Sequence, residues 1–252
     1  MKTNKFTTPL SFFTTLLFVA LSLPSRAAAA DRLPNLGMKR LQDISIEQTS
    51  DGRRLLKFTT IIVNVGLGPF ELHGQRATTL NPDMDVKQRI YNDTGGYRDI
   101  TTSAVMYYAG DGHNHWHVRD LETYELIRLD NGVKVGTGVK HGFCFFDNVQ
   151  NDLTLPGAPQ SPFYINCGSH DPSALQVVMG LSVGWGDRYS ASLATQYIDI
   201  TGLGAGRYRL RATADANNWF LESNETDNST WADMHLKGKG SSIRIIGYGP
   251  GY

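Results

Sequence analysis

Three histidines at alternate positions, His113, His115 and His117, are the residues of this chain best suited to carry chemistry. If the run is extended, side chains at i, i+2 and i+4 point to one face of a strand, and the three imidazoles converge. On a helix the same spacing would turn His115 away from the other two. Three neutral imidazoles bind copper or zinc and leave a coordination position for water or substrate. The run therefore predicts a strand that carries a metal site, although exposed polar residues of a sheet could show the same spacing.

The elements that must position this site are predicted to be strands, because the hydrophobic periodicity along the chain is mostly two. A β-branched run at 55–65 is typical of a buried strand. Alternation over 120–129, followed by a turn at 130–132, predicts a hairpin with 133–135. The weakly patterned stretch 74–102 is predicted to be loop. The sequence favours an all-β, single-domain β-sandwich with long loops around the metal site. Further strands are predicted at 143–145, 196–200, 206–214 and 243–246.

The first thirty residues have the form of an export signal: two lysines, an apolar stretch at 12–23, and small residues up to Ala30. The apolar stretch is short for a membrane span, and no later run is long enough for one. We expect residues 1–30 to be a cleaved signal peptide and residues 31–252 to form a secreted catalytic domain. Three of the 24 basic residues lie in the signal, so 21 would face 24 acidic ones. This balance gives no reason to expect a nucleic-acid partner.

The two cysteines, Cys144 and Cys167, are an even number in a chain with an export signal. One disulfide is therefore the expected state, and a pair of free buried thiols is the alternative. Under the chain-entropy model, a crosslink of this span contributes about 3 kcal/mol to stability.

The histidine run is the first of six short motifs that occur in the same order in the catalytic domain of lysyl oxidases. On these motifs the chain resembles that domain over residues 33–235. In that family the His-x-His-x-His run binds copper, so the resemblance implies that His113, His115 and His117 are copper ligands. It also implies an amine oxidase that converts primary amines, peptidyl lysine among them, to aldehydes. Dioxygen would be the oxidant, and ammonia and hydrogen peroxide would be released. The motifs lie at 113–117, 124–126, 139–144, 187–189, 196–201 and 222–228.

The family's organic cofactor, lysine tyrosylquinone, is built from a lysine and a tyrosine of the protein itself. By motif, the lysine is Lys140, four residues before Cys144, and the tyrosine is Tyr189. The quinone binds the substrate amine covalently, and a base must then remove a proton from the substrate α-carbon. Asp187, which would share a face with Tyr189 in an extended segment, is the candidate base, although an aspartate after Gly186 also fits a turn. Without the resemblance, Lys140 fits a solvated lysine at a strand end and Tyr189 a half-buried core phenol.

A late acidic run offers a second metal site, because it is rich in the hard oxygen ligands that calcium prefers. By resemblance, this run binds calcium together with an Asp-Leu pair near the start of the domain, which here reads Asn35-Leu36 and lacks one charge. The alternatives are a solvated loop and glycosylation at Asn224 and Asn228. The candidate calcium ligands are Asn35, Leu36, Glu222, Asn224, Asp227 and Asn228.

Compared with animal lysyl oxidases, the chain keeps only two cysteines, has Gly112 before the histidine run, and carries an insertion around 169–179. We therefore expect a distant, non-animal-type member, for which collagen and elastin are not implied as substrates. Two rival functions stay open. One is a non-enzymatic metal-binding β-sandwich that never makes the quinone, and the other is zinc hydrolysis with Asp120 as base. Only the oxidase needs both Lys140 and Tyr189.

Overall fold

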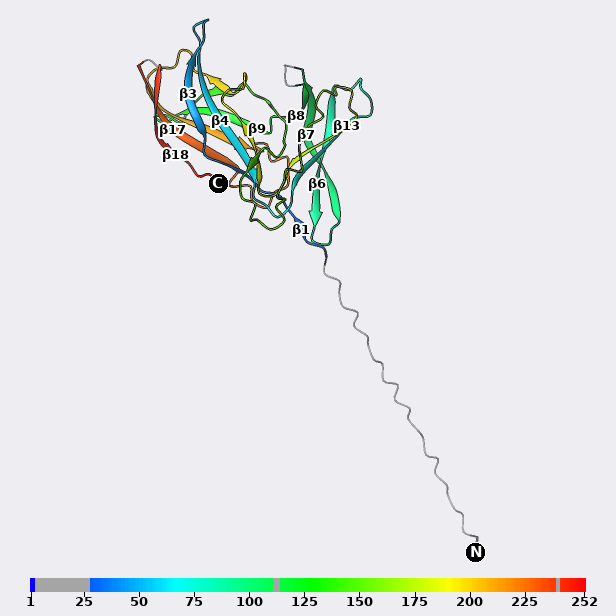
Figure 1. Ribbon diagram of the computed structural model, residues 1–252. Helices are drawn as coiled ribbons and strands as arrows, with labels where there is room; N and C mark the ends of the chain where they lie inside the picture. Colours follow the sequence, from blue (N-terminus) through cyan, green and yellow to red (C-terminus); the bar gives the residue numbers. More distant parts are fainter. Residues whose placement is uncertain (3–27, 111–113, 239–240) are drawn as a thin grey trace.

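The computed structural model describes residues 1–2, 28–110, 114–238 and 241–252, and every regular element within these ranges is a strand (Figure 1). The all-β prediction is confirmed. The predicted signal peptide lies almost entirely outside the described residues and stays a prediction. In the part of the chain that is described, no helix is long and apolar enough to cross a membrane.

The first sheet carries the histidine run and lies on one side of the molecule (Figure 1). Its antiparallel strands follow the order β11-β8-β7-β6-β5-β13, and β1 is added beside β6. β8 begins at His115, so the described part of the run, from His115 to His117, is extended as predicted. The bounds are β1 (Asp31–Arg32), β5 (Phe70–Gln75), β6 (Asp83–Asn92), β7 (Tyr97–Ala109), β8 (His115–Arg119), β11 (Gly142–Phe143) and β13 (Gln176–Leu181).

The stretch 74–102, which was predicted to be loop, instead contributes most of a long hairpin made by β6 and β7. The prediction was wrong for two reasons. β6 does alternate, with Met84 and Val86 buried between exposed charged residues, but the polar Gln88 occupies the next inward position, where it bonds to backbone atoms. β7 is mostly exposed along its first half, so burial imposes no apolar pattern on it.

Two further sheets pack together on the other side of the molecule (Figure 1). β4 is the predicted strand at 55–65, and β9 and β10 are the predicted hairpin. Phe58 of β4 meets Tyr124 of β9 edge to face, with ring centroids 4.9 Å apart, and one hydrophobic core continues through all three sheets. One sheet has the order β12-β14-β4-β15, with β2 and β3 also beside β4, and the other β10-β9-β16-β17-β18. The bounds are β2 (Leu36–Met38), β3 (Gln42–Gln48), β4 (Arg54–Asn64), β9 (Glu122–Arg128), β10 (Lys134–Thr137), β12 (Val149–Gln150), β14 (Trp185–Tyr189), β15 (Tyr197–Asp199), β16 (Gly206–Ala214), β17 (Ser229–Lys237) and β18 (Ser242–Tyr248).

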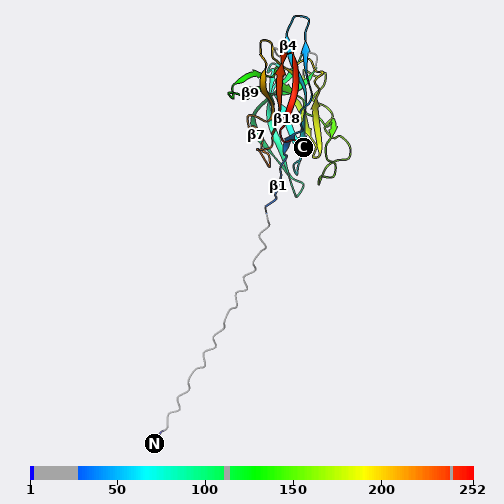
Figure 2. The same ribbon diagram turned by 90° about the vertical axis from the view of Figure 1, so that its left-hand side faces the viewer.

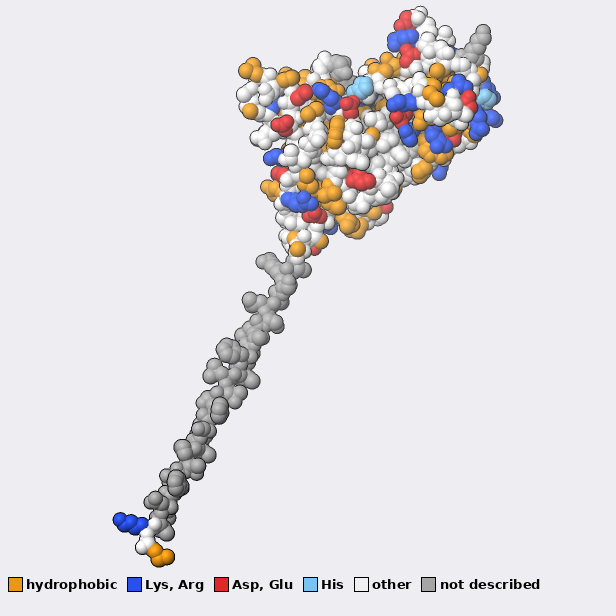
Figure 3. All heavy atoms as spheres, turned by 180° about the vertical axis from the view of Figure 1, so that it is seen from behind, with side chains coloured by type: hydrophobic (Ala, Val, Ile, Leu, Met, Phe, Trp, Pro, Cys, Tyr) orange, Lys and Arg blue, Asp and Glu red, His pale blue; other side chains and the backbone are white. Residues whose placement is uncertain are grey.

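The outside of the domain mixes charges of both signs. Seen from the side of β18, the domain is narrower than in the first view (Figure 2). On the face seen from behind, basic and acidic side chains are interspersed and form no extended field of one sign (Figure 3).

A disulfide joins Cys144 and Cys167, as the sequence predicted. Cys144 directly follows β11, and the carbonyl of Cys167 accepts a hydrogen bond from the amide of Trp116, between the two described histidines. The crosslink therefore ties the segment that follows Lys140 to the histidine strand.

Candidate active site

The candidate metal ligands are carried by β8, which places His115 and His117 on one face. Their Nε2 atoms lie 2.7 Å apart, His117 is buried and His115 is half-buried. Two imidazole nitrogens this close together could both bind one ion, and imidazole is a ligand that copper accepts. The two imidazoles thus fit the predicted copper ion. His113 lies outside the described residues, so its role stays a prediction.

His117 is held in place from two neighbouring strands. It pairs with Tyr107 of β7, whose ring stands edge-on to the imidazole at a centroid distance of 5.8 Å. On the other side Gly142 of β11 packs against both rings. A Cβ at Gly142 would lie 2.6 Å from His117 Nδ1 and 2.1 Å from the Tyr107 hydroxyl oxygen. A glycine is therefore needed here because any side chain would displace the histidine ring.

Lys140 lies in the segment between β10 and β11 and points inward. Backbone hydrogen bonds fix this segment on both sides, from Val139 to the carbonyl of Tyr197 and from Asp120 to the carbonyl of His141. Lys140 is only 5% exposed, so the alternative of a solvated lysine at a strand end is wrong. Its Nζ lies 4.8 Å from the centre of the Tyr189 ring.

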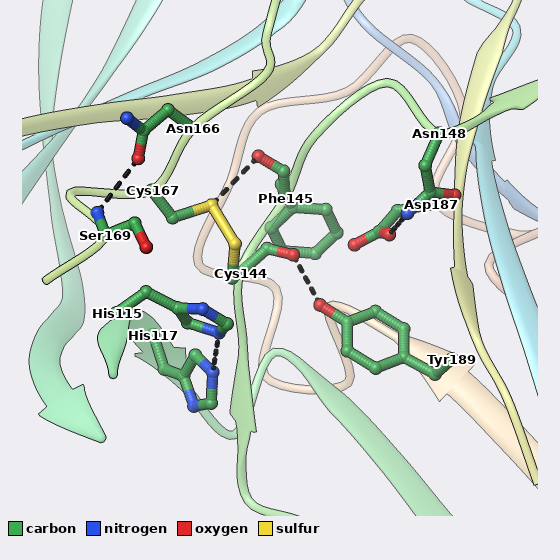
Figure 4. The surroundings of a disulfide bond; sticks show 10 residues. All are labelled: His115, His117, Cys144, Phe145, Asn148, Asn166, Cys167, Ser169, Asp187 and Tyr189. Atoms are coloured by element: carbon green, nitrogen blue, oxygen red, sulfur yellow. Dashed lines mark hydrogen bonds between the residues drawn. A yellow bond between two sulfur atoms is a disulfide. The ribbon is translucent and has the colours of Figure 1, made fainter. Parts of the chain in front are cut away.

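Tyr189 and Asp187 stand two residues apart on β14, which pairs with β4, and both side chains are buried. The turn alternative for Asp187 is therefore wrong. The Tyr189 hydroxyl donates a hydrogen bond to the carbonyl of Cys144, and the Asn148 amide donates one to Asp187 Oδ1 (Figure 4). Burial raises the pKa of Asp187 to about 7, and the hydrogen bond from Asn148 opposes part of that shift. Asp187 can thus exchange a proton near neutral pH.

One cavity of about 190 Å³ brings the described candidates for catalysis and copper binding together. Figure 4 shows the rings of His115 and His117 facing each other and the Tyr189 hydroxyl turned toward Cys144. A larger cavity of about 360 Å³ lies beside Tyr91, but no predicted site residue lines it. Asp120, the base of the hydrolytic alternative, does not line the site cavity and bonds to His141 instead. The lining residues are His115, His117, Lys140, Cys144, Phe146, Asp187, Arg188, Tyr189 and Leu193.

A second buried carboxyl group, Glu122, was missed by the sequence analysis. It is 1% exposed, accepts hydrogen bonds from Tyr124 (2.8 Å) and Thr60 (3.2 Å) on Oε2, and has no partner on Oε1. Thr60 is the backbone partner of Tyr189, so Glu122 lies close to this candidate cofactor residue. Burial raises the pKa of Glu122 to about 8. The signal was present, because Glu122 falls on the same face of the alternating strand as Tyr124 and Leu126.

We expect Glu122→Gln to flatten the pH dependence of stability in chelator-treated protein. The pKa of Glu122 is about 8 in the folded state and near 4.3 unfolded, so the folded state holds the extra proton between these values and stability falls as pH rises through them. In wild type the free energy of unfolding should fall between about pH 5.5 and about pH 8. In Glu122→Gln this fall should be smaller by on the order of 2 kcal/mol. Denaturant titrations measure it, with Glu125→Gln on the same strand as the control. An unchanged loss would contradict the burial of this carboxyl group.

A separate cluster gathers the residues predicted to bind calcium. The Asn35 amide donates to Asp227 Oδ2 (3.0 Å), the Asn228 amide donates to Glu222 Oε1 (2.8 Å), and the Leu36 backbone amide donates to Glu222 Oε2. Two segments that are far apart in sequence are thereby joined, as the prediction required. Asn228 is only 5% exposed, so it is not accessible as a glycosylation acceptor.

The oxygens of this cluster fit a cation. Three buried oxygens of the cluster have no hydrogen-bond partner: Asn35 Oδ1, Asp227 Oδ1 and Asn228 Oδ1. Burying such oxygens unpaired lowers the stability of the fold unless a cation lies beside them. Burial also raises the pKa of Glu222 to about 8. Calcium accepts carboxylate and amide oxygens of this kind. Asn224 is the exception, because it is exposed and its Oδ1 accepts hydrogen bonds within its own turn.

Two acids that the sequence analysis did not select border this cluster. One carboxylate oxygen each of Asp215, Glu222 and Glu225 lies within 4.8 Å of the others. Asp215 is buried, and its two oxygens accept the backbone amides of Trp219 and Phe220. Asp215 therefore shapes the loop that leads into the cluster.

Comparison with known proteins gives consistent matches. The family model for lysyl oxidase matches residues 86–246. Lysyl oxidase homolog 1 of Homo sapiens is 31% identical over 128 residues, which are 50% of this chain and 20% of that protein. Lysyl oxidase homolog 3A of Danio rerio is 31% identical over 177 residues, 70% of this chain and 18% of that protein. Lysyl oxidase homolog 2A of Danio rerio is 28% identical over 180 residues, 71% and 19% respectively. The chain spans about a fifth of the length of these relatives.

Proposed function

Because this chain belongs to the lysyl oxidase family, we propose that it oxidises primary amines, the side chain of lysine among them, to aldehydes. Dioxygen and one water molecule are consumed, and ammonia and hydrogen peroxide are released with the aldehyde. The form of the first thirty residues supports export from the cell, and residues 31–252 would then be the catalytic domain.

One observation carries this proposal. Lys140 Nζ and the Tyr189 ring, 49 positions apart in sequence, lie 4.8 Å apart in the cavity that His115 and His117 also line. Full burial of a lysine is rare in proteins, because its ammonium group loses hydration. A buried lysine against a buried tyrosine, beside two converging imidazoles, is the arrangement that a cofactor made from these two residues requires.

His115 and His117, with His113 from outside the described residues, would hold the copper ion. When bound, copper together with dioxygen would supply the oxidation of Tyr189 to a quinone linked to Lys140, and this quinone would bind the substrate amine. The Cys144 carbonyl orients the Tyr189 hydroxyl, and the disulfide fixes that carbonyl next to the histidine strand.

Asp187 is the proposed proton acceptor for the substrate α-carbon. It lines the cavity, and its pKa of about 7 lets it take a proton at neutral pH and return it to solvent. Phe146 and Leu193 form apolar walls of the same cavity and restrict water around the reacting groups. The cavity thus places a candidate proton acceptor beside two apolar side chains.

The strongest rival is a metal-binding β-sandwich without enzymatic activity. Such a module needs the histidines, but it does not need Lys140 and Tyr189 in contact within the same cavity. Zinc hydrolysis is further weakened because Asp120, its proposed base, does not line the cavity. The contact between Lys140 and the Tyr189 ring therefore favours the oxidase over both.

We also propose a calcium site at Asn35, Leu36, Glu222, Asp227 and Asn228, without Asn224, whose side-chain oxygen bonds within its own turn. The three buried oxygens without partners at Asn35, Asp227 and Asn228 support it. Its position, joining the start of the domain to the loop before β17, points to a structural role.

The function is tested on copper-loaded, aerated wild-type protein. Redox-cycling staining of the denatured chain should be positive, and a digest should contain a peptide that joins the Lys140 and Tyr189 segments. Peroxide release from a simple primary amine should accompany both signals. Two unmodified peptides, together with no peroxide at full copper occupancy, would place the binding module ahead of the oxidase.

A further inference from the structure

The segment 249–252 is docked onto the domain beside the proposed calcium site. The amide of Tyr252 donates to the carbonyl of Met38 (3.1 Å), and the Thr230 hydroxyl donates to the carbonyl of Pro250 (2.6 Å). The Tyr252 ring lies against Gly37 of β2, where a Cβ would be 2.2 Å from a ring carbon. The position of Tyr252 is thus fixed by two hydrogen bonds and by the close contact of its ring with Gly37.

In this position the Tyr252 hydroxyl contacts the proposed calcium site. It donates a hydrogen bond to Asp227 Oδ2, the oxygen that also accepts the Asn35 amide. The other oxygen, Asp227 Oδ1, is buried and has no partner. A phenol has an ordinary pKa near 10, so its hydroxyl is a hydrogen-bond donor at neutral pH. A cavity lined by Asn35, Asn224, Asp227 and Tyr252 adjoins this contact.

We propose that Tyr252 is a positioning residue of the cation site, which holds Asp227 so that its second oxygen is presented to a divalent cation of the calcium class. This inference rests on the calcium site proposed above. A carboxylate with both oxygens free can rotate, whereas one with Oδ2 fixed by two donors offers Oδ1 in a single direction. Groups that orient metal ligands in this way typically contribute 10- to 100-fold to metal affinity.

The same contact makes the coupling reciprocal. If the docked tyrosine strengthens cation binding, the bound cation must stabilise the docked tyrosine by the same factor. Calcium should therefore slow exchange of the Tyr252 amide hydrogen, which is bonded to Met38, and this effect does not depend on any enzymatic activity. A tyrosine that served only to fill space at Gly37 would not respond to calcium in this way.

The test compares wild-type protein with Tyr252→Phe, which keeps the ring and removes only the hydroxyl. Calcium titration calorimetry should show about tenfold weaker binding in the variant. Hydrogen exchange should show calcium-dependent protection at residue 252 in wild type and little in the variant. Tyr248→Phe, at the exposed end of β18, is the matched control and should bind calcium as wild type does.

The possible outcomes distinguish failure of the positioning role of Tyr252 from failure of the proposed calcium site. If wild-type protein binds no calcium, the proposed site fails and Tyr252 has no role there. If wild type and Tyr252→Phe bind equally, with exchange at residue 252 unaffected by calcium, the site stands and the positioning role is overturned. Tighter binding in Tyr252→Phe would also overturn it, since the phenol would then compete with the cation for Asp227. Equal thermal unfolding temperatures of the two proteins in chelator show that the comparison concerns folded chains.

Discussion

Replacement of Tyr189 by phenylalanine should abolish peroxide release from a primary amine while leaving copper occupancy unchanged. The ring would remain in its place among Phe143, Cys144 and Lys140, so the fold should persist. Without the hydroxyl oxygen, however, the ring cannot be converted to a quinone, and covalent capture of the amine has no electrophile. Activity should fall to background, since no other described residue can replace that carbonyl.

Three measurements on the same preparations make this result specific: elemental analysis, quinone staining and mass spectrometry of the Lys140–Tyr189 peptide. Tyr208→Phe is the control, because Tyr208 is equally buried but bonds to the carbonyl of Gly204 outside the site cavity. Lys140→Ala should also lose the crosslinked peptide and the native activity, although it keeps the oxidisable tyrosine. Full activity in Tyr189→Phe would remove this residue from the mechanism.

Replacement of His117 by alanine should abolish stoichiometric copper binding, with a corresponding loss of cofactor formation. His117 contributes one of two nitrogens that converge within 2.7 Å, and it is buried where water cannot substitute freely. Two remaining imidazoles cannot complete the site. We expect the same result for His115→Ala and, from the spacing in sequence, for His113→Ala.

Copper content per chain after dialysis measures this second effect, and His235→Ala on β17 is the control. Cofactor peptide and peroxide should disappear in parallel with copper in each site variant. Full copper occupancy in two of the three single variants would overturn the assignment of the metal ligands. A variant that keeps copper but releases no peroxide would instead show that the histidine is needed after copper binding, in cofactor formation or amine oxidation.

Local patterns determined those parts of the site that lie within one strand. Alternation at period two was enough to place His115 and His117 on one face of β8, and Asp187 with Tyr189 on one face of β14. The even cysteine count was enough to predict the disulfide. These inferences hold because side-chain direction along a strand depends only on the neighbouring residues. The same reasoning failed for 74–102, where the partner strand and not the local apolar pattern makes the hairpin.

The sequence by itself therefore determined the all-β class, the faces of individual strands and, through its motifs, the lysyl oxidase family. Only the tertiary structure decided which faces meet. It brought Lys140 to the ring of Tyr189, buried Glu122 beside them, and seated Tyr252 over Asp227. The reason is that strand pairing between distant segments is set by how the whole hydrophobic core closes, and no spacing within a single segment records the identity of its partner.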